Sequence, residues 1–279
     1  LYPRQLCFIE RKPMGRLGAD PSAPYVISRP SKHPPWSNLS GIENKVEVEF
    51  LRPVLLGESI LPYRLFRPFE AVVPVTDKGE VLDAEAAANR GFEGLHGWMK
   101  KAEKLWTSNA KSQSKTLIGR WNYHNELGAQ FPLAPLRVVY AASGTNTAAC
   151  IIRAGTYVIE NGLYWVPVRG EQEAHFLIAL FNSETTRSRI AARQSRGQWG
   201  ARHFHKVMFN LPIPRFDVAD SLHNAIAEAA REAETIAASV PLPENIKFQR
   251  ARGLIRAALK DAGIAQRIDA LVAKLLDGG

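Results

Sequence analysis

The chain has 279 residues, a hydrophobic fraction of 46% and a net charge of +9, so it is long and apolar enough to fold around a sizeable core. No apolar run approaches the roughly 18 to 20 residues of a membrane-spanning helix, and charges interrupt the N-terminal apolar stretch, so neither a membrane protein nor a signal peptide is expected. Cys7 and Cys150 are the two cysteines, which indicates a reducing, cytoplasmic setting, and the basic balance favours a polyanionic partner.

The first half of the chain predicts loops and strands followed by helices. Residues 1–44 are rich in proline and glycine and predict extended pieces joined by loops. Apolar and acidic residues alternate over 44–50, the pattern of a half-buried strand, and 71–75 is a second strand candidate. Apolar residues recur every three or four positions over 93–106 and again over 117–127, which predicts two helices.

The middle of the chain is rich in β-branched and aromatic residues. Four short segments there predict strands, namely 137–142, 147–152, 156–160 and 163–168. Asn161 and Gly162 form a dipeptide typical of a two-residue hairpin turn, so we expect the last two strands to pair with each other.

The last third of the chain predicts helices. Residues 171–181 are apolar on most sides, which is typical of a buried helix, and Asn182 and Ser183 are expected to end it and cap a following helix. Further helices are expected over 218–238 and over 244–276, with a break near Gly263. The fold class is therefore α+β: a mixed domain of antiparallel hairpins and helices with an α-helical C-terminal extension.

The segment between the buried helix and the C-terminal helices holds most of the excess charge. Residues 184–215 contain seven basic side chains against one acid, a net +6 of the chain's +9. If 184–196 is helical, Arg189, Arg193 and Arg196 share one stripe at i, i+4 and i+7. Two glycines then bracket Gln198 and Trp199, which predicts a polar and aromatic loop tip. A solvated basic face is the alternative to an anion-binding surface.

Catalytic motifs were sought and none assigns an activity to this chain. Residues 32–36, Lys-His-Pro-Pro-Trp, have the outline of an amino-methylase tetrapeptide but carry His at the polar position. The acid-x-Lys triplets at 10–12 and 43–45 lack the rest of a nuclease metal site. His203 and His205 have no neighbouring carboxylate or cysteine, so no metal site is predicted. No catalytic residue is predicted.

The order of several segments resembles the target-recognition (TaqI-like C-terminal specificity) region of large N6-adenine DNA methyltransferases of restriction-modification and related phage-defence systems. The resemblance is carried by VEVEFLRPVLLGESILPYR, RVVYAASGTNTAACIIRAGTYVIENGLYWVPV, EQEAHFLIALFNSE and HKVMFNLPIP, in that order. It implies a connecting segment over 1–44 from a missing catalytic part, a DNA target-recognition domain over 45–215 and a helical C-terminal extension over 216–279.

The resemblance also implies partners and a cofactor for a longer parent chain. The parent would bind S-adenosylmethionine, flip an adenine out of double-stranded DNA and methylate its N6 amine, with this part reading the sequence beside a catalytic domain of the same chain. No cofactor is expected in this chain, because the glycine turn and the polar-Pro-Pro-aromatic site are absent. The first residue is Leu, so we expect a piece of a longer protein.

The charge pattern and the resemblance together predict DNA contacts. Arginines and one lysine would neutralise phosphates, Gln198 would reach a base edge, and the polar turn after residue 142 would form a second contact loop. The candidates are Arg189, Arg193, Arg196, Gln198, Trp199, Arg202, Lys206, Ser143, Thr145 and Asn146. Two alternatives stay open, a self-contained nuclease or methylase domain and a helical protein-interaction module.

Overall fold

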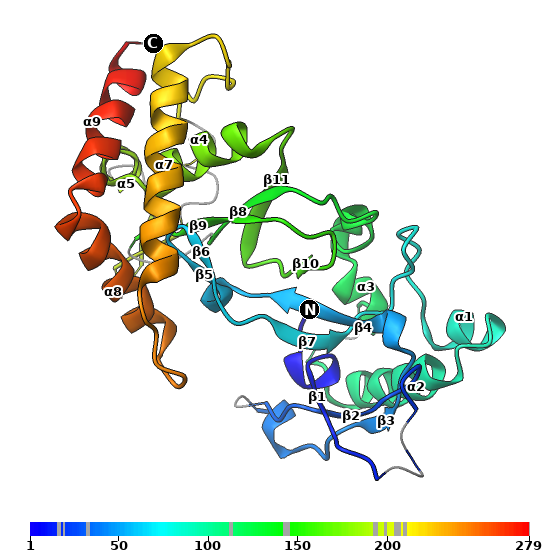
Figure 1. Cartoon of the computed structure of the whole chain (residues 1–279). Coiled ribbons are helices and arrows are strands. Elements are labelled where there is room, and N and C mark those ends of the chain that lie inside the picture. The colour runs from blue at the N-terminus through cyan, green and yellow to red at the C-terminus, as the bar shows by residue number, and fades with distance from the viewer. Residues whose placement is uncertain are drawn as a thin grey trace. The chain divides into compact units, whose positions relative to one another are not determined.

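The structure is a computed structural model of the whole chain (Figure 1). It describes every residue except 16, 17, 19, 32, 33, 112, 113, 142–145, 192–194, 198, 199, 204–207, 209, 210 and 279, and at 195–197 and 200–203 it describes the backbone alone. The chain divides into two compact units. Unit 1 comprises Leu1–Val54, Pro68–Leu133 and Thr156–Asn161, and unit 2 comprises Leu55–Arg67, Ala134–Gly155 and Gly162–Gly279.

Unit 1 is built on two small sheets. β1 (Ile9–Arg11), β2 (Tyr25–Ser28) and β3 (Glu43–Lys45) form an antiparallel sheet in chain order, and β4 (Leu51–Leu55) lies between β7 (Phe69–Val72) and β10 (Val158–Ile159) in the other. Leu6, Cys7 and Phe8, just before β1, are buried together with Ile9. The described residues of 1–44 belong to this folded unit.

Helices complete unit 1: α1 (Ala84–Asn89), α2 (Glu93–Asn109) and α3 (Leu117–Trp121). The apolar spacing over 93–106 is confirmed, since α2 buries Leu95, Trp98, Met99, Ala102 and Trp106. The second helix is shorter than expected, because α3 ends at Trp121 and 3₁₀ turns follow it.

The strand expected over 44–50 is confirmed only at residues 44 and 45, the end of β3, and the contacts of Glu47 give the reason. Its carboxylate accepts hydrogen bonds of 2.8 Å from the backbone N–H groups of Gly94 and Leu95, at the start of α2. A 3₁₀ turn follows at Val48–Phe50 and leaves Val48 46% exposed. Glu47 thus caps backbone N–H groups at the start of α2 that have no partner within the helix. This capping outweighs the strand preference of the alternating pattern.

Unit 2 carries a three-stranded antiparallel sheet in the order β11 (Leu163–Pro167), β8 (Arg137–Ala141), β9 (Ala149–Ile152). The hairpin expected at Asn161-Gly162 is wrong, because β11 pairs with β8 whereas β10 pairs with β4. Two further antiparallel ribbons are β5 (Ile60–Leu61) with β6 (Arg64–Leu65) and β12 (Ser195–Gly197) with β13 (Gly200–His203).

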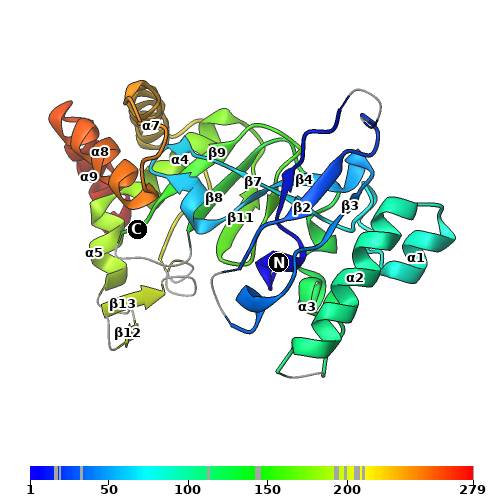
Figure 2. The same ribbon diagram turned by 90° about the horizontal axis from the view of Figure 1, so that it is seen from below.

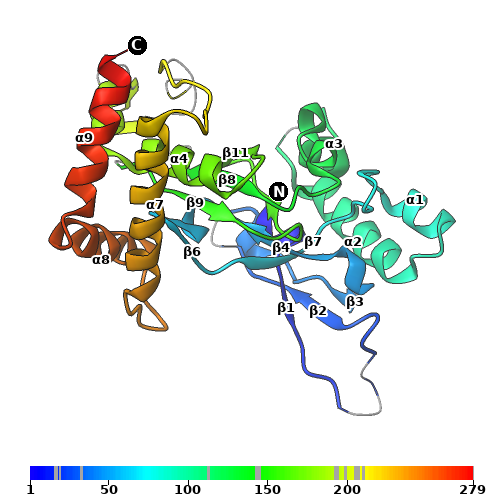
Figure 3. The same ribbon diagram turned by 45° about the horizontal axis from the view of Figure 1, so that its top comes forward.

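The helices of unit 2 are α4 (Glu171–Asn182), α5 (Glu184–Ala191), α7 (Ser221–Ser239), α8 (Phe248–Asp261) and α9 (Ile264–Asp277). Figure 3 shows α7, α8 and α9 gathered beside α4. The expected break between the last two helices is confirmed at Gly263, which has a left-handed φ of 74° that suits glycine.

The C-terminal helices share one core with the rest of unit 2. Small residues let α7 approach α4 closely, since Ala229, Ala230 and Ala233 are fully buried in the same cluster as Phe176 and Leu180 of α4. The α-helical C-terminal part of the chain therefore shares the core of unit 2, and the alanine face of α7 is covered within the chain. The mixed helices and small antiparallel sheets of the two units confirm the α+β class.

Among the residues that the structure describes, none of the helices has the length and apolar character needed to cross a membrane.

Candidate nucleic-acid interface

The start of α5 is fixed by side chains on both sides of it. Ser183 ends α4 and its hydroxyl accepts a hydrogen bond of 3.2 Å from Thr186 N, as the sequence predicts for a cap. The carboxylate of Asp269, from α9, accepts bonds from the backbone N–H groups of Glu184 at 2.8 Å and Thr185 at 3.4 Å. The helix that opens the basic segment is thus tied to the C-terminal helices.

Both arginines of α5 have carboxylate partners. Arg187 binds Glu184 through two nitrogens, with Nε at 2.7 Å from Oε2, and this bond lowers the pKa of Glu184. Arg189 pairs with Asp277 and donates to the carbonyl oxygen of Leu276 at 3.0 Å. The side chain of Arg189, a predicted DNA contact, therefore engages the end of α9.

The helical stripe of three arginines is wrong. α5 ends at Ala191, and Arg196 lies on strand β12, so Arg189 and Arg196 do not share a helix. Arg193 lies outside the described residues. An i, i+4, i+7 spacing predicts a common face only while the backbone stays helical.

Beyond α5, the basic segment forms an antiparallel ribbon. β12 and β13 pair with Arg196 opposite Ala201 and Gly197 opposite Gly200, with a register irregularity between Ser195 and Arg196. Figure 2 shows the ribbon at the end of α5 that points away from α7. Gly197 and Gly200 form the last pair of the ribbon.

Most predicted contact residues fall outside what the structure describes. Gln198, Trp199, Lys206, Ser143 and Thr145 lie outside the described residues. The side chains of Arg196 and Arg202 do as well, although their backbones belong to β12 and β13.

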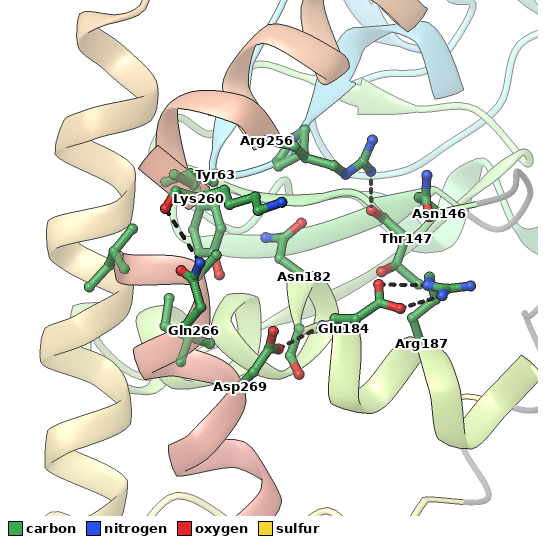
Figure 4. Close-up of a pocket in the computed structure, with 16 residues that line it drawn as sticks. Tyr63, Asn146, Thr147, Asn182, Glu184, Arg187, Arg256, Lys260, Gln266 and Asp269 are labelled. Carbon is green, nitrogen blue, oxygen red and sulfur yellow. Dashed lines mark hydrogen bonds and ion pairs between the residues drawn. The ribbon is translucent and has the colours of Figure 1, made fainter. Parts of the chain in front are cut away.

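Asn146, which is described, lies on the wall of a cavity of about 460 Å³ in unit 2 (Figure 4). The walls come from the turn at 62–63, residues 146–147, the junction of α4 with α5, and the α8–α9 corner. The Asn182 amide holds two of these walls together, since it accepts from Ala149 N and donates to Ala149 O, both at 3.0 Å. Asn182 and Ser183 thus shape this cavity as well as ending α4.

Two cations of α8 face this cavity and were not among the sequence candidates. Arg256 and Lys260 lie one helical turn apart, and Figure 4 shows both side chains extending from α8 toward the cavity. Arg256 donates to the Thr147 carbonyl at 2.8 Å, and burial lowers its pKa. Their i, i+4 spacing was visible in the sequence, but nothing there separated it from an ordinary solvated helix face.

Residues of the motifs considered for catalysis make packing contacts or ion pairs. Trp36 is 3% exposed and stacks on Trp106, with ring centroids 5.9 Å apart, while His33 lies outside the described residues. Glu10 pairs with Arg29 at 3.4 Å, and Glu43 lies 3.7 Å from the ammonium group of Lys12. Both acidic triplets therefore have cations beside their carboxylates.

Across the described part of the chain, no group of three or more His, Cys, Asp or Glu side chains is placed to hold a metal ion. Burial raises the pKa of Cys7 and of Cys150 to about 12, so both thiols stay protonated at neutral pH.

Comparison with known proteins gives matches among the solved structures alone. No protein-family model matches the sequence, and no curated protein matches it either. One similar solved structure is that of the type IIG restriction endonuclease BpuSI, at 16% sequence identity and a TM-score of 0.39, over 81% of this chain and 26% of that one. This chain thus spans about a quarter of that protein's length. A TM-score of this size assigns neither a fold nor a function.

Proposed function

We propose that this chain binds double-stranded DNA and reads its sequence, as the specificity part of an N6-adenine DNA methyltransferase or a combined restriction-modification enzyme. The observation that carries the proposal is the net +6 over residues 184–215, a segment whose centre is the antiparallel ribbon β12–β13. DNA is the polyanion whose grooves suit such an element, because the major groove admits a two-stranded ribbon.

In this proposal, different residues in and around the ribbon position the protein on the duplex and read its bases. Arg196 and Arg202, one on each strand, with Arg193 and Lys206 flanking the ribbon, would neutralise phosphates and fix the register on the duplex. Gln198, which lies between the two strands in the sequence, is the candidate for reading adenine, since its amide matches the N6 and N7 edge in the major groove.

The α5 arginines contribute less to this surface than their number suggests. Arg187 and Arg189 are already paired with Glu184 and Asp277, so binding a phosphate would first require one of these ion pairs to break. Asn146, beside the cavity, is a second polar contact candidate together with Ser143 and Thr145.

Methyl transfer itself is assigned to a catalytic domain of the same parent chain. The resemblance described from the sequence supports this arrangement, and S-adenosylmethionine would bind in that domain.

Selection from a random duplex library tests the proposal. The chain is expected to enrich one short motif, and Gln198→Ala to enrich a degenerate version of it, because a bidentate base contact is worth roughly 1 to 3 kcal/mol of discrimination. The control is Arg231→Ala, an exposed arginine of α7 paired with Glu228. Retention of duplexes without any enriched motif would contradict sequence reading, and no retention at all would contradict DNA binding.

A further inference from the structure

The charges around the cavity of unit 2 do not balance. Its two carboxylates are already engaged: Glu184 accepts both nitrogens of Arg187, and Asp269 accepts backbone N–H groups at the start of α5. Among the described side chains, no carboxylate forms an ion pair with Arg256 or Lys260. Arg256 and Lys260 therefore face the cavity without a direct ion pair, although the Glu184 carboxylate is near enough to Arg256 to favour its charged form.

Arg256 is the more constrained of the two cations. It is partly buried, and the hydrogen bond described for it, to the Thr147 carbonyl at 2.8 Å, uses one of its five N–H donors on a neutral acceptor. Removing a cation from water is costly unless an anion or further acceptors replace the lost hydration. Lys260 is exposed and follows Arg256 by four residues, so both side chains leave the same face of α8 toward the cavity.

Part of the cavity lining is apolar. Leu259, Ile264 and Ile268, each at most 4% exposed, form this part together with the ring of Tyr63. A volume of about 460 Å³ lies within the range of small-molecule sites, roughly 300 to 1,000 Å³. A lining that offers both cations and apolar side chains suits a ligand with an anionic group and an organic body.

We propose that this cavity is a binding site for a phosphate monoester, with the phosphate on Arg256 and Lys260 and the organic group against Leu259, Ile264 and Ile268. The lining carries one more positive than negative charge, since Arg187, Arg256 and Lys260 stand against Glu184 and Asp269, and the guanidinium fork of Arg256 matches the geometry of phosphate oxygens. The site is independent of the DNA-reading ribbon. Its ligand is a free nucleotide-sized phosphate ester or the terminal phosphate of a nucleic acid, which share this chemistry.

Calorimetry on the full chain at low ionic strength tests the site with adenosine 5′-monophosphate, adenosine and inorganic phosphate. We expect the monophosphate to bind, adenosine to bind at least tenfold more weakly, and Lys260→Ala to weaken the monophosphate about tenfold, since a hydrogen bond to a charged group is lost. Arg256→Met should abolish binding. Lys274→Ala, an exposed lysine of α9 outside the cavity lining, should change nothing.

Three outcomes would overturn the proposal: no binding of the monophosphate, equal binding of adenosine, or unchanged binding by Lys260→Ala. The Lys260 variant keeps the test decisive if Arg256→Met does not fold, because Lys260 is exposed.

Competition separates this site from DNA reading. A blunt duplex without terminal phosphates should not displace the monophosphate, whereas a 5′-phosphorylated duplex that does displace it would identify a DNA end as the source. Displacement by the unphosphorylated duplex would instead assign the cavity to the DNA surface and contradict the monoester proposal.

Discussion

Within unit 2, helix α5 carries two arginines and helix α8 carries three, and the two helices differ in what their arginine side chains bind. On α5, Arg187 and Arg189 pair with carboxylates. On α8, Arg252 donates to the carbonyl oxygens of Gly57 at 2.6 Å and Ile60 at 2.7 Å, and Arg256 donates to that of Thr147. The helix inside the basic segment therefore offers little free charge, whereas the less conspicuous α8 retains it. Available charge depends on where the acids lie in the fold, and the local composition does not show this.

The largest effect on stability is expected for a substitution of Arg252, which can be compared with Arg256 on the same helix. Arg252→Met should destabilise the chain by about 3 kcal/mol, because two buried or half-buried carbonyl groups lose their donors. Arg256→Met should cost less than about 1 kcal/mol without ligand, because it removes one hydrogen bond together with a desolvated charge. Urea unfolding measures both, and equal losses would contradict the distinction.

The next largest effect on stability is expected at Glu234 of α7. Its carboxylate pairs with an arginine, as the carboxylates that bind the α5 arginines do. Burial raises the pKa of Glu234, but hydrogen bonds from His175 and Arg153 outweigh it and lower that pKa to about 2. A depressed carboxylate pKa stabilises the folded chain above the unfolded value, near 4.5, and that stabilisation is lost as the pH falls toward 2.

Glu234→Gln should therefore cost about 2 kcal/mol at neutral pH, allowing for its partial exposure to solvent. The difference from the unchanged chain should shrink between pH 4.5 and 2. Unfolding free energies measured across this window check the prediction, and a difference that is independent of pH would contradict it.

The smallest effect is expected at Arg189. Its pair with Asp277 is partly exposed, and such pairs contribute about 0.5 kcal/mol to stability. Arg189→Ala should lower the melting temperature slightly and leave DNA affinity nearly unchanged, because that side chain already has a partner. A loss of DNA affinity as large as that of a ribbon variant would break the comparison between α5 and the ribbon.

The sequence predicts the elements whose pattern and packing agree. The period-3.6 spacing over 93–106 reflects the face that α2 buries, the apolar character of 171–181 reflects the burial of α4 on most sides, and Gly263 marks the helix break with its positive φ. Pairing partners are harder to predict: the turn dipeptide at Asn161-Gly162 is genuine, yet β10 and β11 join different sheets, since strand pairing depends on distant segments.

The candidate site shows the same limit. Seven basic side chains between 184 and 215 are visible in the sequence, but the partner of Arg189 lies 88 residues away. Arg256 and Lys260 are ordinary basic residues of an amphipathic helix until the fold brings the 146–147 turn and the start of α5 beside them. Which basic side chains lack a carboxylate partner therefore depends on contacts between distant segments, and residue type alone does not show it.

The central claim, that the β12–β13 ribbon meets the DNA backbone, is tested most directly by the salt dependence of duplex binding. Fluorescence anisotropy across several salt concentrations should give the Arg196→Ala/Arg202→Ala variant a log–log slope about two units shallower than that of the unchanged chain, because roughly one counterion fewer is released per lost phosphate contact. Arg231→Ala should keep the original slope. If the ribbon variant binds duplex DNA with unchanged affinity and slope, the basic segment is only a solvated face and the account is contradicted.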